Sequence, residues 1–348
     1  MSSTINKVTA RAMGFLPVYY DIGRGKTVAI VHDNPKKAIA EGIADAARNL
    51  GASALSHNIG EARFGDSNYD TLAQWAGSVD CDLFVNVLDN PAAEVGHRIA
   101  LTELQGGRQI PTMHSPGITE EMFDLELDFP RMLSDANRIK ALLKGAYFIH
   151  LKSAAGTDLV IEVKGREFGD DIAPIRRNSG PDEEYVQNYP KGEVWNAPHE
   201  TGASGRLVVD GPVSTICYTP RNPLLVDFKA GKISSFSFRV MDEEVKAFYD
   251  KIAAEFSRDD WASVIGELGL GLIPLSEFIG NMLLDEKMAG TAHVAVGNNK
   301  GFGKQFGGQN PSARHHDLLV KAPTVQVIYD GGRPPIILMA DGRLNLNQ

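Results

Sequence analysis

The fold of the amino-terminal half is decided by residues 27–51, TVAIVHDNPKKAIAEGIADAARNLG, which predict a buried strand passing directly into a helix. Residues 27–32 are almost all apolar, as in a strand covered on both faces. Asp33, Asn34 and Pro35 supply a cap and a first-turn proline for the helix, and Gly51 ends it. Repeated strand–helix units of this kind generate a mostly parallel sheet flanked by helices.

The same alternation continues to residue 146 and then stops. Further strands are predicted at 52–56, 82–87 and 108–114, with helices near 70–77, 91–105 and 130–144. From residue 147 the chain changes to alternating segments with hairpin-like breaks, such as YFIHLKS at 147–153 and LVIEVKG at 159–165. We therefore expect an open α/β domain at 1–146 and a β-rich α+β domain, carrying the metal site, at 147–348.

Three further elements are predicted inside the second domain. Apolar residues at helical spacing indicate a helix near 242–257 and another over about 274–287. The polar stretch 165–192, rich in Gly, Asp, Arg, Asn and Pro, is typical of a long loop. Because long loops inside compact domains are often functional, this one is expected to act as a lid.

Composition excludes several classes of partner. The chain has 348 residues, and 35 Lys and Arg stand against 44 Asp and Glu, a net charge of −9 without any basic stripe. Nucleic acid is therefore not expected as a partner. The start MSSTINKVTA lacks a signal-peptide layout, and no apolar run approaches the ~18 residues of a membrane span. Together with two isolated cysteines, Cys81 and Cys217, this predicts a cytoplasmic protein that contacts no membrane.

Nucleotide binding is not indicated either. The segment DIGRGKT at 21–27 has Tyr20 where a phosphate-binding loop requires its first glycine, and it precedes a strand instead of following one. No G-x-G-x-x-G follows the strand at 27–32. The first domain is therefore expected to be a scaffold or a lid.

Carboxylates and imidazoles are concentrated in four segments of the second domain. These are GEVWNAPHE at 192–200, GELGLGLIP at 266–274, DEKMAGTAHVAVG at 285–297 and NPSARHHDLLV at 310–320. Side chains alternate faces along a strand, so His315 and Asp317 project from one side and His316 from the other, outward-facing one. Two polar groups that are costly to bury would then share one pocket.

Small neighbours mark the other candidates. Glu267 shares its strand face with Gly269 and Gly271, and His293 shares its face with Ala295 and Gly297, which leaves room for an ion. For each residue taken singly, a structural role without metal binding stays open. A histidine in isolation is more often a hydrogen-bonded core residue than a ligand. Glu193 and Glu286 could equally be solvated at a strand edge and a helix end.

Taken jointly, the candidates form a mixed oxygen and nitrogen donor set without thiolates. That set suits Zn, Co or Mn, and six donors exceed what one tetrahedral zinc uses. Two divalent ions that share a carboxylate and a bridging water are the natural interpretation. The predicted ligands are Glu193, Glu267, Glu286, His293, His315 and Asp317.

The motifs GEV-x-x-AP-x-E, ELG-x-G, DEK-x-x-GT-x-H-x-A-x-G and GG-x-x-x-S-x-x-H-x-D resemble those of the aminopeptidase T and aminopeptidase S family of co-catalytic metallopeptidases. The likeness is close over roughly 147–345. It implies that the same six residues bind the metals, and that a homodimer with an enclosed chamber releases amino-terminal residues from short peptides. Glu267 and Glu286 are the predicted catalytic carboxylates, with Glu267 bridging both ions and taking the proton from the attacking water.

One feature sets this chain apart within that resemblance. The family places a catalytic tyrosine shortly after the first metal-binding histidine, where this chain reads GNNKGF at 297–302. The fold family is also similar to iron-dependent ring-cleaving dioxygenases acting on dihydroxypyridines, and His293, His315 and Asp317 have the composition of an Fe(II) facial triad. One dioxygenase histidine would fall on Glu267, so the triad is not reproduced in place. A catalytically silent metal- or peptide-binding protein is the third alternative.

Overall fold

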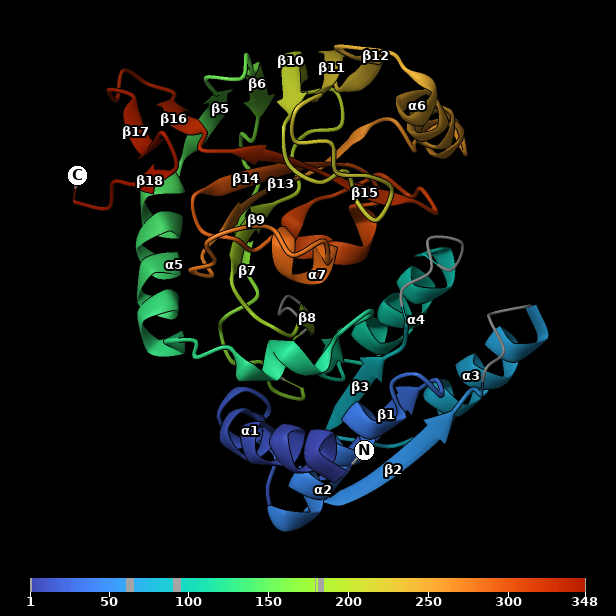
Figure 1. Ribbon diagram of the computed structural model, residues 1–348. Coiled ribbons are helices and arrows are strands. Elements are labelled where there is room, and N and C mark those ends of the chain that lie inside the picture. The colour runs from blue at the N-terminus through green and yellow to red at the C-terminus, as the bar shows by residue number, and fades with distance from the viewer. Residues whose placement is uncertain (1, 61–65, 90–94, 179, 181–184, 348) are drawn as a thin grey trace. The chain divides into compact units, whose positions relative to one another are not determined.

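The computed structural model describes residues 2–60, 66–89, 95–178, 180 and 185–347 (Figure 1). They form two compact units, Met1–Leu127 with Ala173–Lys191, and Asp128–Ile172 with Gly192–Gln348. The chain thus passes between units three times, whereas the sequence predicted one boundary at 146. The reason is that helix α5 (Phe129–Leu143) packs against strands of the second unit, and strand β8 (Val186–Asn188) pairs in the sheet of the first.

The first unit is built around a parallel sheet of order β2-β1-β3-β4-β8. Its other strands are β1 (Thr27–His32), β2 (Ser53–Asn58), β3 (Leu83–Val87) and β4 (Thr112–His114). The helices are α1 (Ser2–Tyr20), α2 (Lys37–Asn49), α3 (Asp66–Ser78) and α4 (Val95–Gly107), with a short 3-10 turn at Glu120–Asp124.

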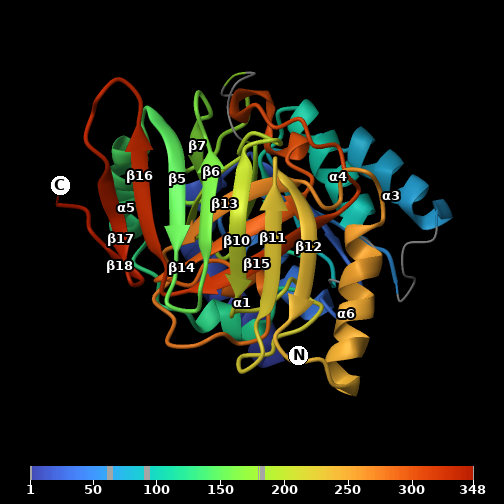
Figure 2. The ribbon, with the colours of Figure 1, turned by 90° about the horizontal axis from the view of Figure 1, so that it is seen from above.

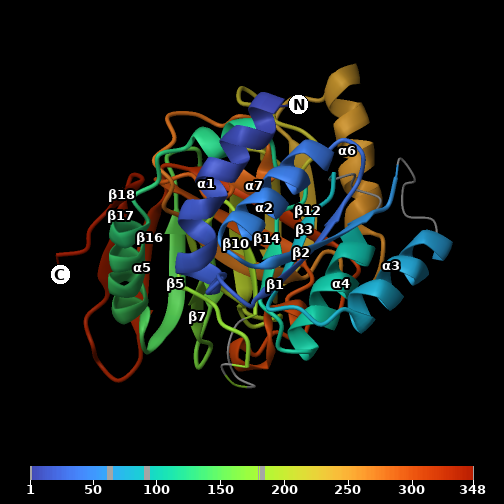
Figure 3. The ribbon, with the colours of Figure 1, turned by 90° about the horizontal axis from the view of Figure 1, so that it is seen from below.

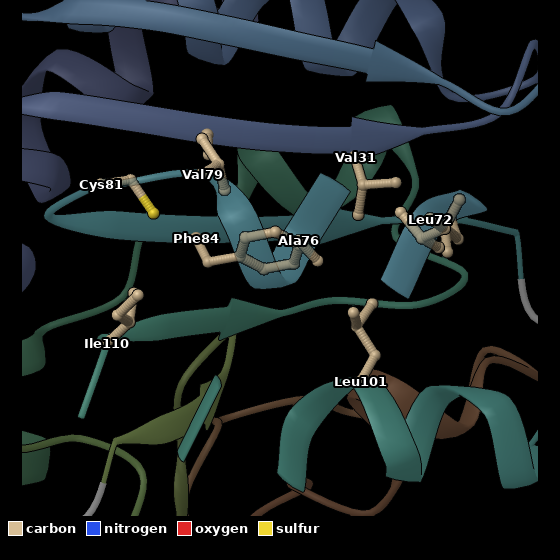
Figure 4. Packing of buried hydrophobic residues seen from close by; sticks show 10 residues of the cluster. Val31, Leu72, Ala76, Val79, Cys81, Phe84, Leu101 and Ile110 are labelled. Carbon is tan, nitrogen blue, oxygen red and sulfur yellow. The ribbon is translucent and has the colours of Figure 1, made fainter. Parts of the chain in front are cut away.

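Helices cover both faces of this sheet. On one face Val31 of β1 and Phe84 of β3 pack with Leu72 of α3 and Leu101 of α4 (Figure 4). The other side carries α2, with α1 beside it (Figure 3). Gly42 allows the close approach of these two helices, since a Cβ there would lie 2.6 Å from Cβ of Val8.

The second unit stacks two antiparallel sheets. The eight-stranded sheet has the order β12-β11-β10-β6-β5-β16-β17-β18, and the five-stranded antiparallel sheet has the order β15-β14-β13-β9-β7. Figure 2 shows β13, β14 and β15 crossing behind the strands of the larger sheet. Strands β13 and β14 are buried at every position, as suits strands that have a neighbour on both sides in the sheet.

The bounds of these strands follow. The eight-stranded sheet contains β5 (Ala146–Lys152), β6 (Asp158–Glu162), β10 (Ala203–Val209), β11 (Leu224–Lys229), β12 (Lys232–Phe238), β16 (Thr324–Tyr329), β17 (Ile336–Ala340) and β18 (Arg343–Leu344). The five-stranded sheet contains β7 (Phe168–Asp170), β9 (Glu193–Asn196), β13 (Ile265–Gly271), β14 (Thr291–Gly297) and β15 (His315–Lys321). Besides α5, the helices are α6 (Glu243–Phe256) and α7 (Met282–Asp285), with 3-10 turns η3 (Lys300–Phe302) and η4 (Lys304–Phe306).

The mixed architecture, a parallel sheet followed by antiparallel ones, agrees with the predicted fold class. Two local predictions were wrong. Residues 165–192 are not one loop, because β7 and β8 form within them and join different sheets. Of the helix predicted over 274–287 only α7 forms, since the Asp285 carboxylate accepts the backbone N–H groups of Ile279 and Gly280 and so favours a turn there.

Helix α1 was not predicted, although Val8, Ala12, Phe15 and Tyr19 recur at helical spacing and are buried. The predicted helix at 91–105 lies partly outside the described residues, which resume at α4. Among the described residues, no helix has the length and apolarity that crossing a membrane requires.

Candidate metal centre

Four neighbouring strands bring five of the six predicted ligands to one face of the five-stranded antiparallel sheet. Glu267 on β13 lies opposite Ala295 on β14, which lies opposite Asp317 on β15. Opposed residues project from the same face, and so do residues two apart along one strand. That face therefore carries Glu193 from β9, Glu267 from β13, His293 from β14, and His315 and Asp317 from β15.

Glycines make room on this face. A Cβ at position 269 would lie 2.0 Å from Cε1 and 2.1 Å from Nε2 of His293, so the imidazole lies directly over the Gly269 backbone. Position 271 is equally tight, since a Cβ there would lie 2.2 Å from the carbonyl oxygen of Met288. The space that the sequence predicted above β13 is thus filled by the candidate ligand His293 and by the turn that leads into β14.

The donor atoms fall into two groups that share Glu267. Its Oε1 lies 3.5 Å from Nε2 of His293, which is 3.6 Å from Oε2 of Glu193. Its Oε2 lies 3.1 Å from Nε2 of His315, which is 3.3 Å from Oδ1 of Asp317. In each group one ligand atom from every residue lies within 4.8 Å of the others. One carboxylate therefore presents a separate oxygen to each group.

Both histidines are held in the orientation that a metal ligand needs. Nδ1 of His293 lies 3.2 Å from the carbonyl oxygen of Glu286, and Nδ1 of His315 lies 2.8 Å from that of Asn298. A carbonyl oxygen only accepts, so each Nδ1 carries the proton and donates it. When the ring is neutral, as a metal ligand must be, its lone pair is then on Nε2, toward the carboxylates. This is the usual arrangement around metal-bound histidine.

A buried carboxylate oxygen of Glu193 also indicates a cation site here. Oε2 of Glu193 has no hydrogen-bond partner among the described residues, although its side chain is almost fully buried. A buried carboxylate oxygen without a partner is costly unless a cation completes it. The donors, the ring orientations and this oxygen together fit a divalent ion in each group.

The electrostatics also favour a cation. Burial disfavours the charged imidazolium, but the hydrogen bond to Glu267 and its charge outweigh burial and raise the pKa of His293 to about 10. Burial likewise opposes the charge on Glu267, yet its two histidine partners lower the pKa of that carboxyl to about 2. His315 holds the pKa of Asp317 well below its usual range in the same way. Without metal, the protonated histidines thus balance the negative charge of the carboxylates. A bound metal ion would balance that charge in their place.

Glu286 is the sixth predicted ligand, and it lies outside both groups. It follows α7, and its Oε1 lies 2.7 Å from Nζ of Lys287. Burial raises the pKa of its carboxyl, and Lys287 only partly offsets that effect. The structure therefore brings Glu286 next to the centre without placing it among the candidate ligand groups.

Sequence reasoning missed the residues behind the ligands. Lys287 is fully buried and forms ion pairs with Glu193, Glu286 and Asp171. Asp171 in turn accepts the backbone N–H of Glu193 at 2.9 Å. The lysine stands in the DEK motif and was visible there, whereas Asp171 fell in the stretch predicted as a loop.

An aromatic wall borders the His315 side of the centre. The ring of Phe302 lies 5.7 Å from that of His315, and Trp195 lies 4.7 Å from Phe302 and 4.3 Å from Phe306. Phe302 belongs to the segment where the aminopeptidase T family places its tyrosine. A phenyl ring lacks the hydroxyl, so this position supplies apolar surface and no hydrogen bond.

His316 projects from the opposite face of β15, as alternation predicted, but the expectation that it is outward-facing was wrong. It is buried, with Nε2 3.2 Å from Oε2 of Glu255 on α6. The helix covers that edge of the sheet, which strand alternation alone does not predict. His316 is thus a packing residue behind the centre.

Gly269→Ala is expected to remove the ion of the His293 group while the protein still folds. The added methyl group overlaps the imidazole and must push it away from Glu193 and Glu267. Elemental analysis after dialysis should show that group losing at least ~10-fold in affinity, as losses of well-placed ligand interactions do. Gly77→Ala is the matched control, because a Cβ there meets nothing within 4 Å. Full metal content in Gly269→Ala would contradict the assignment of His293.

Two solved structures share the fold of this chain. Wild-type AmpT from Thermus thermophilus matches with a TM-score of 0.70 and 16% identity, over 97% of this chain and 98% of that one. The 2,5-dihydroxypyridine dioxygenase of Pseudomonas putida KT2440 matches with a TM-score of 0.65 and 16% identity, over 97% and 96%. At such identity both likenesses show a shared fold.

No curated protein sequence matches the chain significantly. A family model described as thermophilic metalloprotease (M29) matches residues 128–343, which is more than half of the chain and includes all six predicted ligands. The chain therefore belongs to the M29 metalloprotease family, the aminopeptidase T family that its motifs resemble, and is a metallopeptidase.

Proposed function

We propose that this metallopeptidase removes the amino-terminal residue of short peptides with a two-ion centre. The observation that carries the proposal is the pair of donor groups that share Glu267, one oxygen to each. Co-catalytic metal pairs are typically bridged by a carboxylate in this manner, with the ions ~3.5–4 Å apart. Zn, Co and Mn suit the oxygen and nitrogen donors.

Each residue has a distinct role in the proposal. One ion is held by Glu267, His315 and Asp317, and the other by Glu193, Glu267 and His293. When bound, such ions polarise a carbonyl group and lower the pKa of a water molecule. Glu267, which faces both groups, would also take the proton of the attacking water, and Glu286, which lies beside both groups, is the second catalytic carboxylate of the proposal.

The charge of the centre points to the substrate. The four carboxylates of the centre attract the α-ammonium group of a peptide and so place its first carbonyl over the centre. Without a tyrosine hydroxyl near Phe302, oxyanion stabilisation rests on other groups, and turnover is expected to be slow. The homodimer implied by the family resemblance and the cytoplasmic location remain predictions.

Metal stoichiometry tests the two-ion proposal. Protein saturated with Co, Zn or Mn should hold about two ions per chain, and Glu193→Ala should hold about one, because only one group uses Glu193. Elemental analysis of both proteins measures this directly. Saturation of the wild-type protein at one ion, unchanged in Glu193→Ala, would contradict the proposal and favour the mononuclear iron alternative.

A further inference from the structure

The two donor groups differ in what lies behind them. The Glu193 side has a built-in cation, because the fully buried Lys287 donates to Oε1 of Glu193 and lies 2.7 Å from Oε1 of Glu286 and 3.4 Å from Oδ2 of Asp171. No Lys or Arg among the described residues forms an ion pair with Glu267 or Asp317. One group is thus backed by an ammonium ion, and the other is not.

The position of the ammonium group bears on metal binding in two ways. The negative charge of Glu193 is divided, since Oε1 faces Lys287 and only Oε2 faces His293. Glu286, a further carboxylate beside the centre, is paired with the same ammonium group. In a buried, weakly screened site, a fixed positive charge behind a ligand repels an incoming cation and reduces the charge that the ligand offers.

We propose that Lys287 makes the two ion sites unequal, so that the group of Glu267, His315 and Asp317 fills first and the group of Glu193, Glu267 and His293 binds its ion more weakly. The inference rests on the two-ion function proposed above. It also gives that function a regulatory property. Activity would follow the free metal concentration over a range in which the first ion stays bound.

Calorimetric titration of the metal-free protein with Co²⁺ tests the inequality. The wild-type protein should titrate in two steps, with the second dissociation constant at least ~10-fold above the first, within the ~5–150-fold range typical of coupling between sites. Lys287→Met keeps the apolar stem and removes the charge. It should tighten the second step at least ~10-fold and leave the first within a few-fold.

Thermal unfolding separates this role from a purely structural one. Without metal, Lys287→Met should melt below the wild-type protein, because three buried carboxylates lose their counter-ion. Saturating Co²⁺ should then raise the melting temperature of the variant more than that of the wild-type protein. A lysine that only supports the fold would lower both melting temperatures equally, and that result would overturn the inference.

Two control variants test whether the positive charge of Lys287 causes the weak second site. Lys287→Arg retains the positive charge and should keep the second site weak. Lys191→Met removes the other fully buried lysine of the described residues, which lies over the rings of Tyr19 and Tyr20 in the first compact unit. It should leave both dissociation constants unchanged.

If Lys287→Met does not fold, the single-site variants decide the question with the lysine in place. Glu193→Gln leaves only the His315 group and should bind one ion tightly, whereas His315→Ala leaves only the His293 group and should bind one ion weakly. Equal affinities in these two variants, or a second step that weakens in Lys287→Met, would overturn the role of Lys287 while leaving two ions per chain. Wild-type protein that saturates at one ion contradicts the proposed function itself.

Discussion

Glu267→Gln is expected to lower peptide hydrolysis by at least ~10²-fold while the protein still folds. The substitution keeps the size of the side chain, so packing on β13 is preserved. It replaces one of the two oxygens that face His293 and His315 with an NH2 group, whose nitrogen does not bind a metal ion, and it removes the charge shared by both groups. The measurement is kcat/KM on unblocked peptides in saturating Co²⁺, together with metal content, which should fall at both sites.

His316→Ala is the contrast to that variant. The residue lies one position from Asp317, but on the opposite face of β15, where it contacts Glu255 at 3.2 Å. Its loss should cost ~1–3 kcal/mol of stability, the usual penalty for a broken hydrogen bond to a charged partner. Its kcat/KM should stay within a few-fold of wild type. A Glu267→Gln enzyme that is equally active would remove Glu267 from the centre of the mechanism.

Strand alternation explains why much of this centre could be predicted from sequence. His315 and Asp317 share a face because they are two apart, and the glycines of GELGLGL share the face of Glu267. What alternation could not give is the register between strands far apart in sequence. The register places Gly269 of β13 opposite His293 of β14. The imidazole of His293 therefore occupies the space that the missing side chain of Gly269 leaves free.

The residues missed by sequence reasoning act through tertiary contacts. The burial of Lys287 was not predicted, because lysine is almost never fully buried unless it is paired. Its partners, Glu193 and Asp171, come from strand β9 and from the segment after β7, and no local pattern joins them. The burial of His316 depends in the same way on α6, which packs over that edge from a distant part of the sequence.

Segments with strong local periodicity were predicted best. The strand at 27–32 and the helix at 242–257 correspond to β1 and α6. A continuous apolar run determines β1 locally, and apolar spacing with the capping residue Asp242 determines α6. Strand β8 has three residues and no apolar run, so only its pairing with β4 identifies it as a strand. That pairing is also why a segment from the middle of the chain completes the first unit.

The second large effect concerns substrate. Incubated aerobically with Co or Zn, the protein should release free amino acid from unblocked di- and tripeptides and none from their amino-acetylated forms. The α-ammonium group is attracted by the carboxylates of the centre, and acetylation removes its charge and adds bulk at the point that fixes the first carbonyl. A broad peptide panel with amino-acid analysis is the appropriate assay, because Phe302 provides no hydroxyl to steady the oxyanion.

A parallel incubation with Fe(II), oxygen and dihydroxylated pyridines or catechols separates the two chemistries that this fold supports in other proteins. A ring-cleaving dioxygenase needs one iron with open positions, and its donors here would be His293, His315 and Asp317. Glu267 lies between the two histidines and gives one oxygen to each, which divides those donors into two groups instead of one. We therefore expect no oxygen uptake. If oxygen is consumed and no peptide is cut, the donors do not act as two separate metal-binding groups. His293, His315 and Asp317 then act together on a single iron.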